Sequence, residues 1–303
     1  MLGSAERVAT AVVVMALLAG GASAAVAQES PNARDDSASP LDRAEWFPES
    51  FSFGPLIARP DELDLGGALI WANRDNNGEF EGTNLEGVAA VGHRLPVVRF
   101  PRAGQNSPEV VLGFELGVIS RFALEVGQRD LLNSDFRVGA PLTIRHKQWD
   151  VLVELLHVSS HIGDDFLARF GRVNVQVGRN SFEILIGRRF ADAFRVYAGT
   201  DLNIWSSDSV EGIAYRWGAE WDEGLGAQSR PIWPYAAAHF ETSNLTDRVA
   251  GTGVFGSAFR VTRMLFRLEL QGHFGPSPMG QFRTIDEDYV GLNLTGYFFA
   301  RRS

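Results

Sequence analysis

The chain of 303 residues contains no cysteine, which excludes disulfide bonds, thiolate metal sites and a cysteine nucleophile. Lysine is almost as scarce, since Lys147 is the only one. The net charge is −9 at pH 7, and binding to nucleic-acid phosphates needs a concentrated basic patch, so we expect no nucleic-acid partner. Hydrophobic residues nevertheless make up 45% of the chain, enough for a large core, and this composition excludes a disordered protein.

Long apolar runs are missing as well. The run over residues 8–18 lies near the N-terminus, and no other stretch approaches the ~20 apolar residues that a transmembrane helix needs. Arg7 precedes this run and the small residues Ala25–Ala27 follow it, which is the pattern of a secretory signal peptide. We therefore predict a signal peptide over residues 1–27, and after it a periplasmic leader over residues 28–60 whose first part is polar and rich in Ser, Pro and Asp.

The chain from residue 61 to residue 303 has an apolar pattern with a period of two. Between residues 266 and 270, for example, phenylalanine and two leucines alternate with Arg267 and Glu269. Successive side chains of a strand point to opposite faces, so such a run has one apolar and one polar face. We count twelve such runs, near residues 62–73, 83–93, 108–121, 134–146, 148–161, 171–189, 193–205, 211–222, 231–242, 251–260, 263–274 and 286–299.

Long strands of this kind predict an all-β protein, an antiparallel transmembrane up-and-down β-barrel of about 12 strands. In such a barrel the apolar faces meet lipid and the polar faces line the lumen. Closure is required because unpaired backbone groups in lipid cost several kcal/mol each. With the signal peptide, the pattern predicts a Gram-negative outer-membrane protein whose partners are membrane lipid, lipopolysaccharide and, during insertion, the barrel-assembly machinery.

The predicted lumen is lined by charges of both signs, among them Glu115, Arg137, Glu154, Arg216 and Glu269. Two interpretations follow from this lining. The charges form salt bridges in an interior that is water-filled or partly plugged, or they form the selective surface of a narrow solute channel. Twelve strands are fewer than the ~16 of a porin with an open aqueous channel, so a general porin is not expected.

The segment over residues 155–165 concentrates His, Ser and Asp at the outer end of the fifth predicted strand. Glu154 lies earlier in this strand and must face the lumen. The alternation then places His157, Ser159 and His161 on the lipid side, where polar groups are costly unless they have a function or lie among the headgroups.

One hypothesis for this segment is a lipid hydrolase in which His157 is the base and Ser159 the nucleophile. The His-x-Ser pattern at the rim resembles two families of outer-membrane lipid hydrolases, phospholipase A and lipid A 3-O-deacylase. The resemblance implies that an Asn or Glu on the next strand orients the histidine, and Asn174 is the nearest candidate in sequence. The valines that flank Asn174 look lipid-facing, which turns its side chain inward unless a β-bulge intervenes.

A second hypothesis is a cation site formed by His161, Asp164 and Asp165. Carboxylates suit a hard divalent cation such as calcium, which would bridge the rim to lipopolysaccharide phosphates. The third interpretation is structural, with these side chains hydrogen-bonded to loop backbone and to lipid headgroups. These alternatives predict an outer-membrane barrel that binds outer-leaflet lipid or ions at its rim, an acyl-ester hydrolase of the outer leaflet, or a narrow solute channel.

The chain from about residue 50 to residue 299 also resembles an uncharacterised family of bacterial outer-membrane proteins, a domain of unknown function. Five segments carry the resemblance: GPLIARP at 54–60, RDLLNSDFRVG at 129–139, HVSSHIGDD at 157–165, RVN at 172–174 and GPSPMGQF at 275–282. The central segment fits an HxSSHxGD[DE] motif, in which the family often has Glu where Asp165 stands. The resemblance implies a barrel and an envelope location, and no activity. From it we predict that the loops over 122–135, 161–172 and 275–284 lie close together at the barrel mouth.

Overall fold

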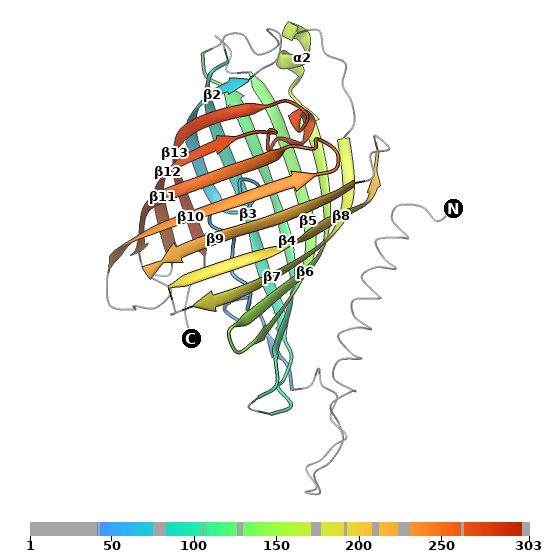
Figure 1. The fold of residues 1–303 in the computed structure, drawn as a ribbon, viewed down its shortest axis with the longest axis vertical. Helices are drawn as coiled ribbons and strands as arrows, with labels where there is room; N and C mark the ends of the chain where they lie inside the picture. Colours follow the sequence, from blue (N-terminus) through green and yellow to red (C-terminus); the bar gives the residue numbers. More distant parts are fainter. Residues whose placement is uncertain are drawn as a thin grey trace, which may run out of the picture.

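The structure is a computed structural model, and it describes residues 41, 43–74, 83–104, 106–125, 130–170, 177–190, 193–207, 212–223, 231–261 and 264–298. Twelve long strands dominate it (Figure 1). Their bounds are β2 (Leu65–Arg74), β3 (Leu85–Arg99), β4 (Glu109–Ala123), β5 (Leu131–His146), β6 (Trp149–Ile162), β7 (Val177–Phe190), β8 (Phe194–Ser206), β9 (Gly212–Asp222), β10 (Ile232–Ser243), β11 (Val249–Val261), β12 (Met264–Phe274) and β13 (Glu287–Phe298).

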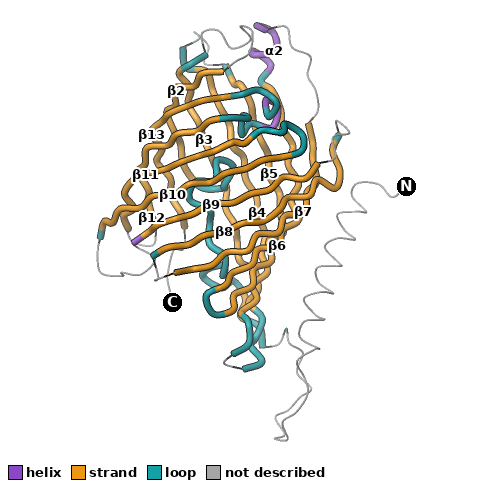
Figure 2. The backbone as a smooth tube through the Cα atoms, in the orientation of Figure 1, coloured by secondary structure: helices purple, strands orange, loops and turns teal. Residues whose placement is uncertain are grey.

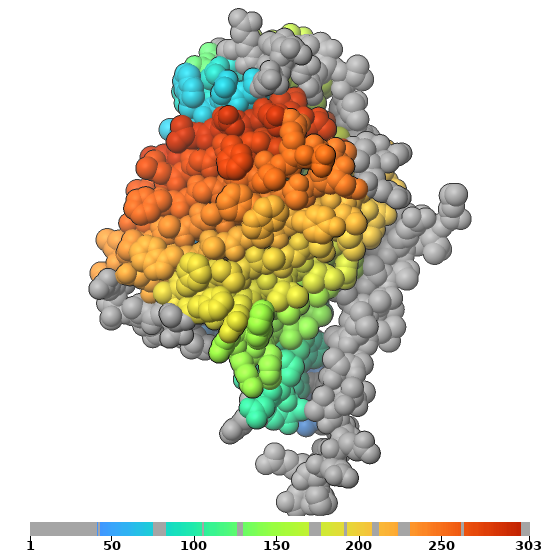
Figure 3. All heavy atoms as spheres, in the orientation of Figure 1, coloured from blue at the N-terminus to red at the C-terminus, as the bar shows by residue number. Residues whose placement is uncertain are grey.

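Each strand pairs antiparallel with its neighbours in sequence, and β13 pairs with β2 to close the sheet into a barrel. The closing register places Leu292 opposite Leu69. Figure 3 shows the strands of the C-terminal half side by side as a continuous wall. The predicted antiparallel barrel of about 12 strands is thus confirmed.

The two faces of the wall differ as the alternation predicts. Large apolar side chains such as Val91, Phe255 and Leu270 are exposed on the outside, where lipid would cover them. The charged side chains that we expected in the lumen, for example Glu115 and Arg216, are buried inside. A strand with these two faces fits only a wall between lipid and a polar interior.

The two ends of the barrel carry connections of different length. Two residues link β5 to β6, whereas residues 163–176 and 275–286 link β6 to β7 and β12 to β13. The long connections hold the helix α2 (Asp164–Phe170) and the 3₁₀ turn η2 (Gly280–Phe282), and we assign this end to the outside because outer-membrane barrels have long extracellular loops. No helix in the described ranges is long and apolar enough to cross a membrane.

Strand β3 continues to Arg99, beyond the predicted end at residue 93. Pro96 lies inside it, and the register with β4 shifts between Pro96 and Val98. Proline cannot donate a ladder hydrogen bond, and a bulge is one of the few places where a strand accepts it. A short strand, β1 (Glu45–Trp46), pairs with this inner extension of β3.

Residues 52–64, which precede β2, lie inside the barrel and form a segment that we call the plug (Figure 2). Phe53 and Leu56 of the plug pack against lumen-facing side chains of β6, β7 and β8. The Ile57 amide donates to the Glu220 carboxylate at 2.8 Å, and Arg195 Nη1 donates to the Gly54 carbonyl at 3.1 Å. We predicted a periplasmic leader up to residue 60, and the plug places the last part of that leader within the lumen.

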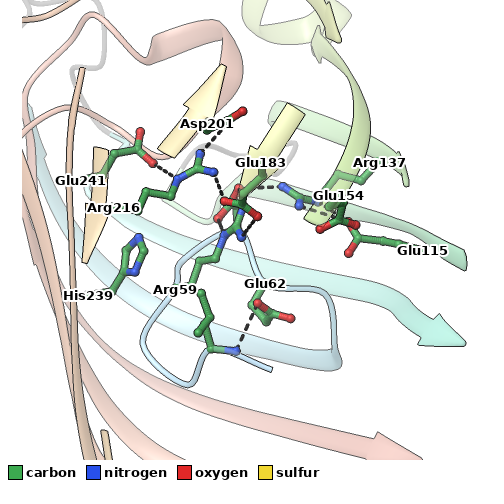
Figure 4. A network of polar contacts seen from close by, with 12 residues as sticks. Arg59, Glu62, Glu115, Arg137, Glu154, Glu183, Asp201, Arg216, His239 and Glu241 are labelled. Atoms are coloured by element: carbon green, nitrogen blue, oxygen red, sulfur yellow. Dashed lines mark hydrogen bonds and ion pairs between the residues drawn. The ribbon is translucent and has the colours of Figure 1, made fainter. Parts of the chain in front are cut away.

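Charged side chains bind the plug to the wall (Figure 4). Arg59 Nη1 lies 2.9 Å from the Glu183 carboxylate, and Asp61 lies 2.6 Å from both Arg59 Nε and Arg137 Nη1. Burial raises the pKa of Asp61, but the guanidiniums of Arg59 and Arg137 outweigh burial and hold this pKa well below its ordinary value. Asp61 therefore stays ionised, and the predicted interior of paired charges is confirmed.

The plug gives a first prediction, on ion conduction. The full chain should conduct little in planar bilayers, because the plug packs against β6, β7 and β8 and its charges pair with the wall inside the lumen. Deleting residues 52–60 should raise single-channel conductance, because the remaining wall is polar and water can enter it. Recordings from both proteins at equal ionic strength would check this. Equal conductance from the two would show that the plug does not block the lumen.

Candidate functional site

Three polar side chains project from the lipid-facing side of β6 near its outer end. His157, Ser159 and His161 alternate with the buried Val158 and Ser160, as the sequence predicts. Ser159 lies about 10 Å from the outer end of β6, given a rise of about 3.3 Å per residue. The three groups therefore lie in the outer part of the barrel wall, close to the outer loops.

His157 is held by an asparagine on the adjacent strand. Its Nδ1 lies 2.7 Å from Oδ1 of Asn180, which is the direct cross-strand partner of His157 on β7. An amide oxygen only accepts, so Nδ1 carries a proton and donates a hydrogen bond to Asn180 Oδ1. In the neutral imidazole the other ring nitrogen, Nε2, is then the one without a proton, which is the tautomer that a general base needs.

Asn174, which we predicted to orient His157, lies outside the described residues. The same alternation predicts that Val177 faces lipid, and this is wrong, because Val177 pairs with the inward-facing Ser160 and lines the lumen. On β7 the even-numbered residues face lipid, as the run of Phe182, Ile184 and Ile186 shows. Asn180 is even-numbered too and therefore faces lipid like His157. The alternation of Phe182, Ile184 and Ile186 was the sequence signal that could have identified Asn180 as the partner of His157.

Ser159 bonds to the histidine on its other side. Its Oγ lies 2.9 Å from Nε2 of His161, and the His161 ring packs edge-on against Phe136 with 5.7 Å between centroids. His157 and His161 are both two residues from Ser159 on the same face of β6, and the Ser159 hydroxyl bonds to His161. The described residues thus contain a serine between two histidines, one of which is oriented by an amide.

The lumen side of the same stretch of β6 is fixed by hydrogen bonds. Ser160 Oγ donates its one proton to the Asp135 carboxylate and lies 3.0 Å from Asn133 Oδ1, and Gln281 Nε2 donates to the Ser160 carbonyl at 2.7 Å. The Gly280 amide donates to Asp135 at 3.0 Å. The connection between β12 and β13 therefore holds β6 from behind at the residue between Ser159 and His161.

Apolar side chains join the three outer loops into one cluster. Its buried members are Ala123, Leu132, Ile162, Phe166, Met279 and Phe282. Phe166 of α2 packs edge-on against Phe282 of η2 with ring centroids 5.7 Å apart, and Arg169 Nε lies 2.7 Å from the Asp130 carboxylate. Position 163, just before α2, requires glycine, because a Cβ there would lie 2.0 Å from the Leu131 carbonyl oxygen. The prediction that these loops lie close together at the barrel mouth is confirmed.

The candidate cation ligands are not brought together. His161 bonds to Ser159 on the lipid side, while Asp164 and Asp165 are exposed in the first turn of α2. Across the part of the chain that the structure describes, no group of three or more His, Asp or Glu side chains could hold a metal ion. Calcium takes six to eight oxygen ligands, so these three residues do not fit a calcium site, and we derive no chemistry through one.

Comparison with solved structures shows the fold. The outer membrane phospholipase A from Escherichia coli has 14% sequence identity and a TM-score of 0.55, and the match covers 80% of this chain and 98% of that one. An outer membrane phospholipase from Salmonella typhi, solved as a dimer with bound calcium, has 15% identity and a TM-score of 0.51 over 76% of this chain and 90% of that one. No curated protein matches by sequence. The family described as "Protein of unknown function (DUF1207)" matches residues 30–299.

Proposed function

The chain belongs to the DUF1207 family of proteins of unknown function, and membership implies no activity. From the geometry of β6 and β7 we propose that the protein hydrolyses acyl esters of outer-leaflet lipids. The hydrogen bond between His157 and Asn180, next to Ser159, carries this proposal. A nucleophile, a base and a group that orients the base are the three parts that serine hydrolases share. Here all three face the lipid.

In the proposed reaction, Ser159 is the nucleophile and His157 is the base. As the Ser159 hydroxyl turns from His161 to His157, its proton passes to His157 Nε2 and its oxygen bonds to the ester carbonyl carbon. The tetrahedral intermediate collapses, the bond to the alcohol breaks, and His157 gives its proton to the leaving alcohol oxygen. A water molecule then cleaves the acyl-serine in the same way, releases the fatty acid and restores the hydroxyl.

Two further observations support a lipid substrate. The three polar groups lie on the outer wall of the barrel, so an acyl ester in the outer leaflet can reach Ser159 without leaving the membrane. The two structures with the same fold are both called phospholipases, although at 14–15% identity they support this protein's fold rather than its activity. The plug, in turn, favours an activity on the outer wall over a solute channel through the lumen.

A serine-directed probe tests the proposal directly. A fluorophosphonate with a long alkyl chain should label Ser159 in the protein refolded in detergent, and mass spectrometry of the peptide should place the label there. The labelled protein should no longer release fatty acid from phospholipid or lipid A, whereas the unlabelled protein should release it.

Fatty-acid release that continues after Ser159 is fully labelled would contradict the proposal. Absence of release by the unlabelled protein, with and without calcium, would also contradict it. The rim motif would then bind lipid or an ion without cleaving it.

A further inference from the structure

The position beside Ser159 on the next strand is a glycine. Gly178 of β7 is the direct cross-strand partner of Ser159, so the two residues share the lipid-facing side of the wall. Because Gly178 has no side chain, none stands opposite Ser159 on β7, and we call this gap in the row of side chains the notch. The neighbouring pair along the two strands, His157 and Asn180, has side chains on both members and forms the inner edge of the notch.

Aromatic rings lie on both sides of the Ser159–Gly178 pair. Phe136 is the partner of Ser159 on β5 and is 48% exposed. On the other side, Trp205 of β8 lies beside Gly178, and a Cβ built on Gly178 would lie 3.7 Å from the indole. The notch is thus a gap between Ser159 and Trp205 with Gly178 as its floor.

The floor of the notch is fixed rather than loose. The Gly178 amide donates to Ser207 Oγ at 2.8 Å, and the Ser207 amide donates to the Gly178 carbonyl at 2.9 Å. A Cβ at Gly178 would meet no atom closer than 3.7 Å, which is ordinary contact distance. The backbone therefore does not require glycine here, and what the glycine provides is the absence of a side chain between Ser159 and the Trp205 indole.

The wall below the notch suits an alkyl chain. Beyond His157 and Asn180, toward the membrane centre, the lipid-facing pairs on β6 and β7 are Leu155 with Phe182 and Val153 with Ile184. An ester in the notch would have its carbonyl at Ser159 and its acyl chain lying over these apolar side chains, inside the leaflet.

We infer that the notch over Gly178, between Ser159 and Trp205, seats the acyl chain of the scissile ester, so the substrate class is long-chain rather than short-chain acyl esters. This inference rests on the proposed function and makes Gly178 a position that determines specificity. A side chain there would fill the space that the first carbons of a long chain need. The acyl group of an acetate ester is too short to occupy that space.

The test compares two esters of p-nitrophenol, palmitate and acetate, dispersed in the same detergent. Gly178→Leu should lower kcat/KM for palmitate relative to acetate by about tenfold or more, the size expected when a hydrophobic pocket loses space for a chain. Gly178→Ala adds one methyl group at contact distance and should lower the ratio by less. Gly253→Leu is the matched control, because Gly253 is an exposed glycine of β11 whose Cβ, if it had one, would meet nothing within 4 Å, and it should leave the ratio unchanged.

The outcomes separate this inference from the function on which it rests. If Ser159→Ala abolishes hydrolysis of both esters while Gly178→Leu leaves their ratio at the wild-type value, the acyl chain does not lie over Gly178 and only the inference fails. If the unchanged protein cleaves neither ester, or Ser159→Ala still cleaves both, the proposed function fails and takes the inference with it. An equal shift of the ratio in Gly253→Leu would also overturn the inference.

Discussion

Asn180→Ala should lower the rate of fatty-acid release on the order of a hundredfold, which lies within the range contributed by a positioned general base. The Asn180 amide oxygen fixes both the orientation and the tautomer of His157 through the hydrogen bond to Nδ1. Without it, the ring rotates and its proton can move to Nε2, where it blocks proton transfer from Ser159. Ser159→Ala should be more severe, on the order of a thousandfold or more, because the nucleophile itself is lost.

Asn174→Ala is the matched control for Asn180→Ala. It removes the same kind of side chain from the asparagine that sequence proximity favoured as the partner of His157, and it should leave fatty-acid release unchanged. Initial rates on phospholipid vesicles, with refolding checked by circular dichroism, would measure all three variants. A rate that falls in Asn174→Ala but not in Asn180→Ala would show that the orienting residue lies at 174 and that the hydrogen bond seen here is not the catalytic one.

The second large effect is expected on stability. Glu183→Ala should lower the free energy of unfolding by about 3–5 kcal/mol, the cost of removing one partner from a buried ion pair. Glu183 is fully buried and binds both Arg59 of the plug and Arg216 of β9, so its loss leaves two buried guanidiniums short of a partner. Denaturant unfolding of the protein in lipid vesicles, followed by tryptophan fluorescence, would measure the change.

Arg248→Ala serves as the control for this experiment. Arg248 pairs with Asp286 at the outer rim, where both side chains are more than two-fifths exposed, and such pairs contribute no more than about 1 kcal/mol. A destabilisation by Glu183→Ala no larger than that by Arg248→Ala would show that the plug is not held by its buried charges.

The barrel itself could be predicted from sequence because its signal is repeated. Each strand alternates between lipid-facing apolar and lumen-facing polar residues, and twelve such runs support one another even where single boundaries are uncertain. The lipid-facing orientation of His157, Ser159 and His161 could be predicted in the same way, because Glu154 in the same strand must face the lumen and the alternation then places the odd-numbered residues on the lipid side.

The partner of His157 could not be predicted so readily, because it depends on register between two strands. The connection from β6 to β7 includes the helix α2, so its length does not fix which residues face each other across the pair. Sequence proximity favoured Asn174, whereas the register pairs His157 with Asn180. Whether the lumen is plugged, and by which residues, stayed open for a related reason, since a segment without periodicity gives no sign of the wall that it contacts.

The position of the plug also constrains the order in which the protein assembles. Residues 52–64 precede β2, and β2 meets β13, the last strand, at the seam that closes the barrel. The partners of the plug include Glu220 on β9 and Glu183 on β7, which lie in the middle of the chain. Threading Arg59 and Asp61 into a closed barrel would strip both charges of water before they meet their partners. The central hairpins would therefore gather around the plug first, and the seam would close last, with the N-terminal segment already enclosed.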